Sequence, residues 1–241
     1  MTYAGYLQTM NYNPLIRLNR LLGIQKRDEE DGVLQMLKRE YHDVSYEPYE
    51  ALPEHWVKDL NLLTSWDTIM GNRRIAVASM GNYFQFSNIR IRRRLFANIH
   101  RNIISGSLLI TTLPQPIHGT TKISFGRYAL RQRYEGERIN IKKNGFTIYS
   151  TAKDSVFSSY FNDEYLHRLK QMCEKLNIDI ALTIKDYHVI CVCSGMRDLF
   201  VIEGSDVKKR EHDAWQDIHT LLYLRMMTYP FTIWDKLGYC D

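Results

Sequence analysis

The sequence lacks acidic side chains over a long central stretch. Asp67 and Glu135 are consecutive acids, and the 67 residues between them contain no Asp or Glu. Eleven of the 32 Lys and Arg residues lie in this gap: Arg73, Arg74, Arg90, Arg92, Arg93, Arg94, Arg101, Lys122, Arg127, Arg131 and Arg133. Crowded like charges repel one another, so a block of one sign needs a counter-charge. Either acids elsewhere in the chain supply it through salt bridges, or the block faces an external polyanion.

Cysteine is also scarce, with four in 241 residues. Four irregularly spaced cysteines do not make a disulfide framework, which favours a reducing compartment. No apolar run approaches the roughly 18 residues of a membrane span. The N-terminus has neither a basic region before an apolar core nor a small-residue cleavage site. We therefore expect a soluble, cytosolic protein whose membrane contacts are peripheral.

Motifs that carry catalysis are missing as well. The glycines fall singly, so neither G-x-x-x-x-G-K-[ST] nor G-x-G-x-x-G occurs, and there is no H-E-x-x-H pair. Cys191 and Cys193 lie two apart, as in a strand, and are expected to be core thiols rather than zinc ligands. The sequence therefore predicts no enzyme, no cofactor and no metal site. The alternative within the enzyme class is a nuclease with acids such as Asp179 and Asp186 as metal ligands.

The chain is expected to have two regions. Residues 1–52 are predicted to form an acidic, partly flexible N-terminal arm with a short helix at 33–41, because charge runs and prolines interrupt its apolar pattern. Residues 53–241 are predicted to form a single α+β domain, which contains the basic block (68–134) and a C-terminal helix (about 206–227).

The domain is predicted to combine an antiparallel or mixed sheet with packed helices. Apolar residues at helical spacing from Trp56 to Trp66 predict a helix that reaches about Ile69 and is closed by Gly71 and Asn72. The other expected elements are strands at 73–80, 83–94 and 198–204, a short helix at 95–104, a strand at 107–113 stopped by the prolines at 114 and 116, hairpins at 137–150 and 178–195, a helix at 161–177, and a final helix with Trp215, Ile218, Leu222 and Met226 as its inward stripe.

The stretch NIRIRRRLFANIHR, residues 88–101, is rich in arginine and is the centre of the basic block. Side chains alternate between the faces of a strand, so Arg90, Arg92 and Arg94 are expected on one face and Ile89 and Ile91 on the other. Guanidinium groups grip phosphate oxygens in pairs, which suits anionic lipid head groups and nucleic acid alike. The contact set expected for lipid or nucleic acid is Arg73, Arg74, Arg90, Arg92, Arg93, Arg94 and Arg101.

Two stretches resemble a known family. LLTSWDTIMGNRRIAVA (Leu62 to Ala78) and YFNDEYLHRLKQMCEKLNIDIALTIKDYHVICV (Tyr160 to Val192) are similar to segments of the matrix proteins of non-segmented negative-strand RNA viruses, particularly rhabdoviruses. The resemblance implies a viral structural protein of the virion and the host cytoplasm, peripheral at membranes, that self-associates. The arm lacks the family's Pro-Pro-x-Tyr and Pro-Ser/Thr-Ala-Pro motifs, and Tyr49 with Leu52 is the candidate docking pair for host sorting proteins instead.

The leading expectation is a non-enzymatic, matrix-type protein that forms homo-oligomers and bridges an anionic membrane surface and viral ribonucleoprotein through its arginine-rich face. The acidic arm of one copy is expected to dock on the basic block of the next. The alternative is an RNA-binding protein, of the nucleocapsid or silencing-suppressor type, that uses the same arginines on phosphates. Phe125 and Tyr128 could then stack on bases, although a core or interface role is the expectation for both.

Overall fold

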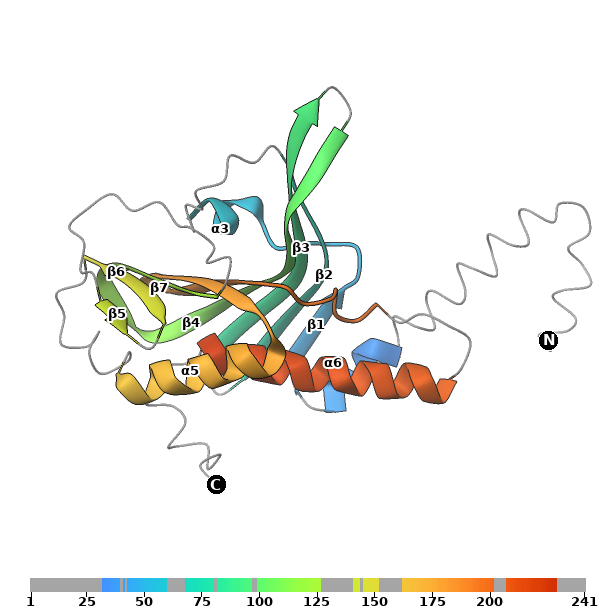
Figure 1. The fold of residues 1–241 in the computed structure, drawn as a ribbon. Coiled ribbons are helices and arrows are strands. Elements are labelled where there is room, and N and C mark those ends of the chain that lie inside the picture. Colours follow the sequence, from blue (N-terminus) through green and yellow to red (C-terminus); the bar gives the residue numbers. More distant parts are fainter. Residues whose placement is uncertain are drawn as a thin grey trace, which may run out of the picture.

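We describe the protein from a computed structural model (Figure 1). The structure describes residues 32–39, 41, 43–59, 68–79, 82–96, 99–126, 141–143, 145–151, 162–201 and 207–228. The statements below concern these residues.

The described chain forms an antiparallel sheet with helices packed on it, which confirms the predicted α+β class. Its strands are β1 (Asp43–Glu47), β2 (Thr68–Ser79), β3 (Asn82–Phe96), β4 (Ile99–Phe125), β5 (Ile141–Lys143), β6 (Phe146–Ser150) and β7 (Asp179–Ser194). The order is β1-β2-β3-β4-β6-β5, and β7 pairs with β4 on its other side. The helices are α3 (Glu54–Asp59), α5 (Asp163–Leu176), α6 (Val207–Thr228) and one at residues 32–39.

The sheet separates two hydrophobic cores. Helices α5 and α6 lie across one face (Figure 1), and Phe84 and Phe86 of β3 are fully buried there in a cluster that includes apolar side chains of both helices. On the other face, Leu52 and Val57, from the loop before α3 and from α3 itself, belong to a second cluster with Ile89. Strand β3 contributes alternate residues to the two faces, as the pleat requires. The arginines of β3 therefore belong to a strand whose position is fixed by packing on both faces of the sheet.

The predicted helix from residue 53 to 69 is wrong at its C-terminal end. Helix α3 ends at Asp59, residues 60–67 lie outside the described part, and β2 begins at Thr68. Gly71 does not close a helix but lies inside β2, where the chain at Ala51 crosses the strand. A Cβ on Gly71 would lie 2.7 Å from the Ala51 Cβ and 2.6 Å from the Asn88 carbonyl oxygen. The glycine is thus required for a close backbone approach.

The predicted short helix at residues 95–104 is also wrong. Leu95 and Phe96 end β3, and Ile99 begins β4. The apolar residues of this stretch fit the helical period, but Arg93 pairs with Arg101 and Phe96 with Ile99 across an antiparallel ladder. Short apolar runs are ambiguous between the two periods, and here the partner strand decides.

Three further expectations about strands fail. The prolines at 114 and 116 do not stop β4, although its pairing with β7 is irregular between Thr112 and Ile117, since proline has no N–H to donate. The predicted hairpin at 178–195 is one continuous strand, β7 (Asp179–Ser194). Asp186, opposite Ile117, has φ 52°, which bends β7 without reversing it. Leu199 and Phe200 of the predicted strand at 198–204 lie in a turn.

The other predicted elements are present. Strands β2 and β3 match the two arginine-bearing segments, β5 and β6 form the expected hairpin, and α5 and α6 match the two long helices. The inward stripe of α6 is shifted from the prediction. Ile218 is buried, together with Leu221 and Leu224, whereas Trp215 and Leu222 pack at the edge of the core.

Part of the predicted arm belongs to the fold. Val33, Leu37 and Tyr41 are buried in the larger core, and β1 pairs with β2 along the edge of the sheet. The expectation of an arm outside the core is therefore wrong for these residues, because the helix at 32–39 has an apolar face that the core covers. Residues 1–31 lie outside the described part, so the arm stays a prediction there.

The loop between β7 and α6 is held by a buried carboxylate. Asp217 of α6 is 1% exposed, and it receives hydrogen bonds from the Phe200 backbone N–H at 2.6 Å and from Arg197 at 2.5 Å. Burial raises the pKa of Asp217 above its ordinary value, while the Phe200 N–H and the Arg197 guanidinium act in the opposite direction. This carboxylate ties residues 197–200 to the middle of α6.

We predict that Asp217→Ala lowers the free energy of unfolding by about 1–3 kcal/mol, because the buried Phe200 N–H loses its acceptor. Asp217→Asn keeps an oxygen for that N–H and should cost less. Urea denaturation measures both variants. Asp213→Ala, on the same helix, is the control, and an equal loss in Asp213→Ala and Asp217→Ala would contradict the assignment.

The same carboxylate gives a pH dependence. Since the folded-state pKa of Asp217 is raised, the folded protein takes up this proton before the unfolded chain does as the pH falls. The stability that the proton brings is present at low pH and is lost as the pH rises through the raised pKa. The parent should therefore gain unfolding free energy relative to Asp217→Asn as the pH is lowered through that range.

Candidate anion-binding site

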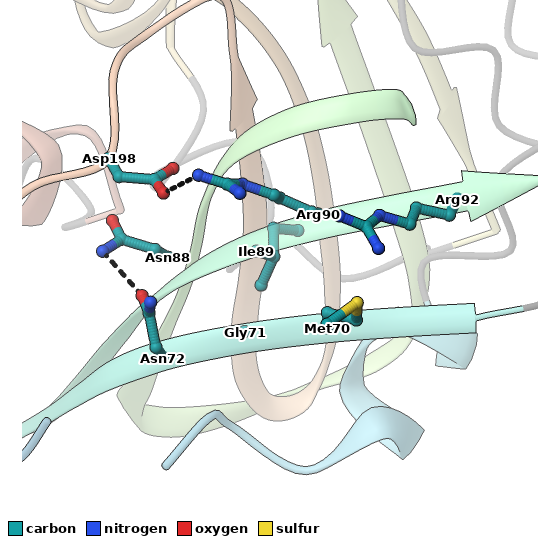
Figure 2. A pocket seen from close by; sticks show the side chains of 8 residues that line it. All are labelled: Met70, Gly71, Asn72, Asn88, Ile89, Arg90, Arg92 and Asp198. Atoms are coloured by element: carbon teal, nitrogen blue, oxygen red, sulfur yellow. Dashed lines mark hydrogen bonds and ion pairs between the residues drawn. The ribbon is translucent and has the colours of Figure 1, made fainter. Parts of the chain in front are cut away.

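The alternation expected for β3 is confirmed where its side chains are described. Ile89 and Ile91 are buried in the smaller core, and Arg90 is exposed on the opposite face. Arg92 lies on the same face as Arg90 (Figure 2). The side chains of Arg94 and Arg101 lie outside the described part, so only their backbone positions are known.

Beyond residue 92, β3 and β4 leave the sheet. The last residue of β3 that pairs with β2 is Arg92, and β7 pairs with β4 from Gly106 onward. Residues 93–96 and 99–101 pair only with each other among the described strands, and they project from the sheet as a two-stranded ribbon (Figure 1). We call this segment the basic ribbon.

The basic ribbon places like charges opposite one another. Arg93 pairs with Arg101, and Arg94 pairs with His100. Like charges directly opposite in an antiparallel pair are destabilising. Arg93 is exposed, and among the described residues none forms a hydrogen bond or ion pair with its side chain. The ribbon therefore concentrates positive charge without a described internal counter-ion.

Other members of the predicted contact set have partners inside the molecule. Arg90 forms an ion pair with Asp198, and Arg74 forms one with Glu50 at 2.8 Å. Arg73 donates from Nε to the Phe200 carbonyl oxygen at 2.6 Å, with its own backbone at φ 56°. For Arg74 and Arg90, acids elsewhere in the chain supply the counter-charge, which was the alternative to an external polyanion. Arg73 and Arg74 hold turns and loops of the fold.

The basic block consequently does not form one exposed face. Lys122 is 6% exposed within β4, and Arg92 donates from Nε to the Asn102 side-chain oxygen at 3.0 Å. Arg127, Arg131 and Arg133 lie outside the described residues. The described positive charge that remains available is concentrated on the basic ribbon.

A shallow pocket lies at the base of the ribbon, on the helix side of β3. It is lined by Met70, Gly71, Asn72, Asn88, Ile89, Arg90, Arg92 and Asp198 (Figure 2). Its volume of about 90 Å³ is well below the roughly 300 Å³ of a typical organic ligand site. Asp198 already neutralises Arg90 there, so the pocket has less need of an external anion than the ribbon does.

Asn88 fixes the pocket's floor. It is 2% exposed, its amide nitrogen donates to the Leu199 carbonyl oxygen at 2.9 Å, and its amide oxygen accepts from the Leu199 N–H at 2.9 Å. The amide thus pairs with Leu199 as a neighbouring strand would. Its nitrogen also donates to Asn72 at 3.1 Å. This arrangement holds Asp198 beside Arg90.

The two residues predicted to bind host sorting proteins, Tyr49 and Leu52, are not both accessible on the surface. Tyr49 is 67% exposed, but Leu52 is 4% exposed in the smaller core, and its N–H donates to the Ser87 hydroxyl at 3.3 Å. A sorting protein that needs both side chains would reach only the tyrosine. The prediction is therefore wrong for Leu52, because the chain at this point must cover the sheet.

The candidates for metal chemistry are spread apart. Asp179 and Asp186 lie seven residues apart on β7, and about 20 Å of extended strand separates them, so they do not form one metal site. Cys191 and Cys193 are buried core thiols, as predicted, with sulfurs 3.8 Å apart. Within the described ranges, no cluster of three His, Cys, Asp or Glu side chains is placed to hold a metal.

Two residues of the candidate site could not be found from the sequence. Asp198 and Asn88 reach Arg90 and Leu199 across more than a hundred residues, and no local pattern marks such partners. The excess of acids outside the basic block was the available signal, and it pointed to internal pairing without naming the pairs.

The fold and the ribbon define an α+β protein with a projecting basic hairpin. No family model matches the sequence, and no curated protein matches it. Among solved structures, the chain is similar to the mycobacterial trehalose monomycolate transport factor A, with 8% sequence identity and a TM-score of 0.41, over 85% of this chain and 96% of that one. Likeness at this level assigns no function. None of the described helices is long and apolar enough to cross a membrane.

We predict that Asp198→Asn strengthens binding to a polyanion, because it removes the internal counter-ion of Arg90 beside the ribbon. Glu50→Gln is the matched control, since it adds the same net charge but frees Arg74, which holds a turn. On immobilised heparin, Asp198→Asn should elute at higher salt than Glu50→Gln. Equal elution would mean that only the net charge matters.

Proposed function

We propose that this protein is a non-enzymatic structural protein that binds an anionic membrane surface through its basic ribbon. The observation that carries the proposal is the direct pairing of Arg93 with Arg101 on a ribbon that projects from the sheet. Such an arrangement costs stability in the isolated molecule. An external anionic surface would offset that cost, and each base near it contributes about 1 kcal/mol.

The matrix-type role is part of the proposal. A peripheral membrane protein that self-associates and also contacts viral ribonucleoprotein needs a basic surface whose charges are not used within its own fold. The division of the arginines supports this role. Arg73, Arg74 and Arg90 form hydrogen bonds or ion pairs with other residues of the same chain, whereas the ribbon projects from the sheet. The host cytoplasm and the virion are the proposed locations.

RNA is the second candidate ligand, and one observation favours it. The exposed guanidinium group of Arg93 can contact RNA phosphates as readily as lipid phosphates. However, Phe125, considered above for base stacking, packs against Phe146 at a ring distance of 4.7 Å. The described part of the chain therefore offers the phosphate contacts more readily than the stacking contacts.

We predict that Arg93→Ala with Arg101→Ala weakens binding to phosphatidylserine vesicles about 30-fold, since two bases are worth about 2 kcal/mol. The same change should leave the free energy of unfolding unchanged or slightly higher, because it removes a repulsive pair. Liposome flotation and urea denaturation measure the two effects. Arg168→Ala with Lys170→Ala removes the same charge from α5, away from the ribbon, and should float nearly as the parent does.

Two outcomes would contradict the proposal. If the ribbon variant floats as well as the parent, the lipid surface lies elsewhere. If the parent does not float but binds RNA on filters, with an affinity that falls steeply with salt, RNA is the ligand.

A further inference from the structure

The pocket at the base of the basic ribbon combines charges of both signs. Arg90 and Arg92 lie beside each other on one face of β3, and Asp198 reaches that face from the loop after β7 (Figure 2). The wall of the pocket thus includes two guanidinium groups and one carboxylate. All of its lining residues, including these three side chains, lie in the described part of the chain.

Each of the three charged groups keeps hydrogen-bonding capacity. Arg90 donates from Nη2 to Asp198 Oδ2, and Arg92 donates from Nε to the Asn102 side-chain oxygen. Among the described residues, none bonds to Asp198 Oδ1 or to the terminal nitrogens of Arg92. A guanidinium has five N–H donors and a carboxylate about four acceptor positions. The internal bonds therefore leave donors and acceptors that a ligand in the pocket can use.

The position of the carboxylate is fixed before any ligand arrives. The Asn88 amide binds both backbone groups of Leu199, the residue that follows Asp198. The next residue, Phe200, donates its backbone N–H to the buried carboxylate of Asp217. A group that is already held in place loses less conformational entropy when it binds a ligand. The pocket is in this sense prepared for binding.

The charges of the pocket are the reverse of those on a phosphoserine head group. That group has two anionic parts, the phosphate and the carboxylate, and one cationic part, the ammonium. Two guanidinium groups and one carboxylate match them in number and in sign. A simple phosphate would instead bring an anion beside Asp198, which is unfavourable. The pocket volume of about 90 Å³ equals that of about three water molecules, which suits a small polar group.

We propose that this pocket binds the serine head group of phosphatidylserine. Asp198 accepts from the ammonium group, Arg90 binds the carboxylate, and Arg92 binds the phosphate. This inference rests on the proposed membrane function and names the lipid that the protein would select. A basic ribbon that acts by charge alone attracts all lipids of equal charge alike, whereas the pocket distinguishes their head groups.

The first test compares two lipids of equal charge. Phosphatidylcholine vesicles contain the same fraction of either phosphatidylserine or phosphatidylglycerol, which has the phosphate but neither the ammonium nor the carboxylate. The unmodified full chain should bind the phosphatidylserine vesicles about fivefold more tightly, as measured by flotation over a range of lipid concentrations.

The matched variants separate head-group recognition from net charge. Asp198→Asn should bind phosphatidylglycerol more tightly than the parent does, because Arg90 is freed, but it should lose the preference for phosphatidylserine. Glu50→Gln adds the same net charge by freeing Arg74, away from the pocket, and should keep that preference. A preference that survives in Asp198→Asn would overturn the assignment.

The second test uses the chirality of serine. Three groups attached to one carbon distinguish the enantiomers when they contact three different side chains, whereas electrostatic attraction does not. The parent should bind vesicles that contain phosphatidyl-L-serine more tightly than vesicles that contain phosphatidyl-D-serine. Asp198→Asn should bind the two equally. Because this comparison needs only the unmodified chain, it decides if Asp198→Asn does not fold.

The outcomes separate this inference from the proposed function. If the parent floats equally well on all three lipids, the pocket does not recognise the head group, and the electrostatic function survives. If the parent floats on none of them, the proposed membrane function itself fails. Soluble phosphoserine has the same charged groups as the lipid. If it releases the protein from vesicles at a concentration below that of the accessible lipid, the free compound is the ligand and the lipid assignment fails.

Discussion

The buried carboxylate of Asp217 fixes one loop, and the arginine-bearing part of the sheet depends on that loop. Asp217 holds the Phe200 N–H, and the Phe200 carbonyl oxygen in turn holds Arg73. Leu199, next in the chain, pairs with the Asn88 amide in the middle of β3. A carboxylate this deeply buried costs free energy unless every oxygen is used, and here both oxygens accept hydrogen bonds. Helix α6 and strand β3 are thereby joined through polar groups as well as through the core.

This polar connection explains why the arginines of the basic block have different roles. Those near the loop, Arg73 and Arg90, meet oxygen atoms that the loop presents. Those beyond the last sheet pairing, such as Arg93 and Arg101, occupy directly opposite positions of the ribbon. The division follows the described geometry of the sheet: β2 pairs with β3 as far as Arg92, and none of the described strands lies beside the ribbon beyond that residue.

Local pattern was sufficient for the parts of the fold that local chemistry determines. The alternation of Ile89 and Ile91 with arginine predicted β3 and its faces, and the periodicity of α5 and α6 predicted both helices. It failed where a distant strand selects the structure. Residues 95–104 fit a helix by period, but the β4 ladder satisfies their backbone groups as a ribbon. The predicted hairpin at 178–195 is instead the continuous strand β7, because β4 stays paired with it on both sides of the irregularity at Asp186.

The candidate site shows the same limit more sharply. Composition identified an excess of positive charge, but it could not separate arginines that stabilise the fold from arginines left outside it, because Glu50 and Asp198 are distant in sequence from their partners. The separation matters for function. An ion pair such as Arg74 with Glu50 contributes to the stability of the molecule itself, whereas like charges directly opposite each other on a ribbon lower that stability. Features that lower stability in isolation usually persist where a ligand compensates for them. In the proposed function, an anionic surface is what offsets the direct pairing of Arg93 with Arg101.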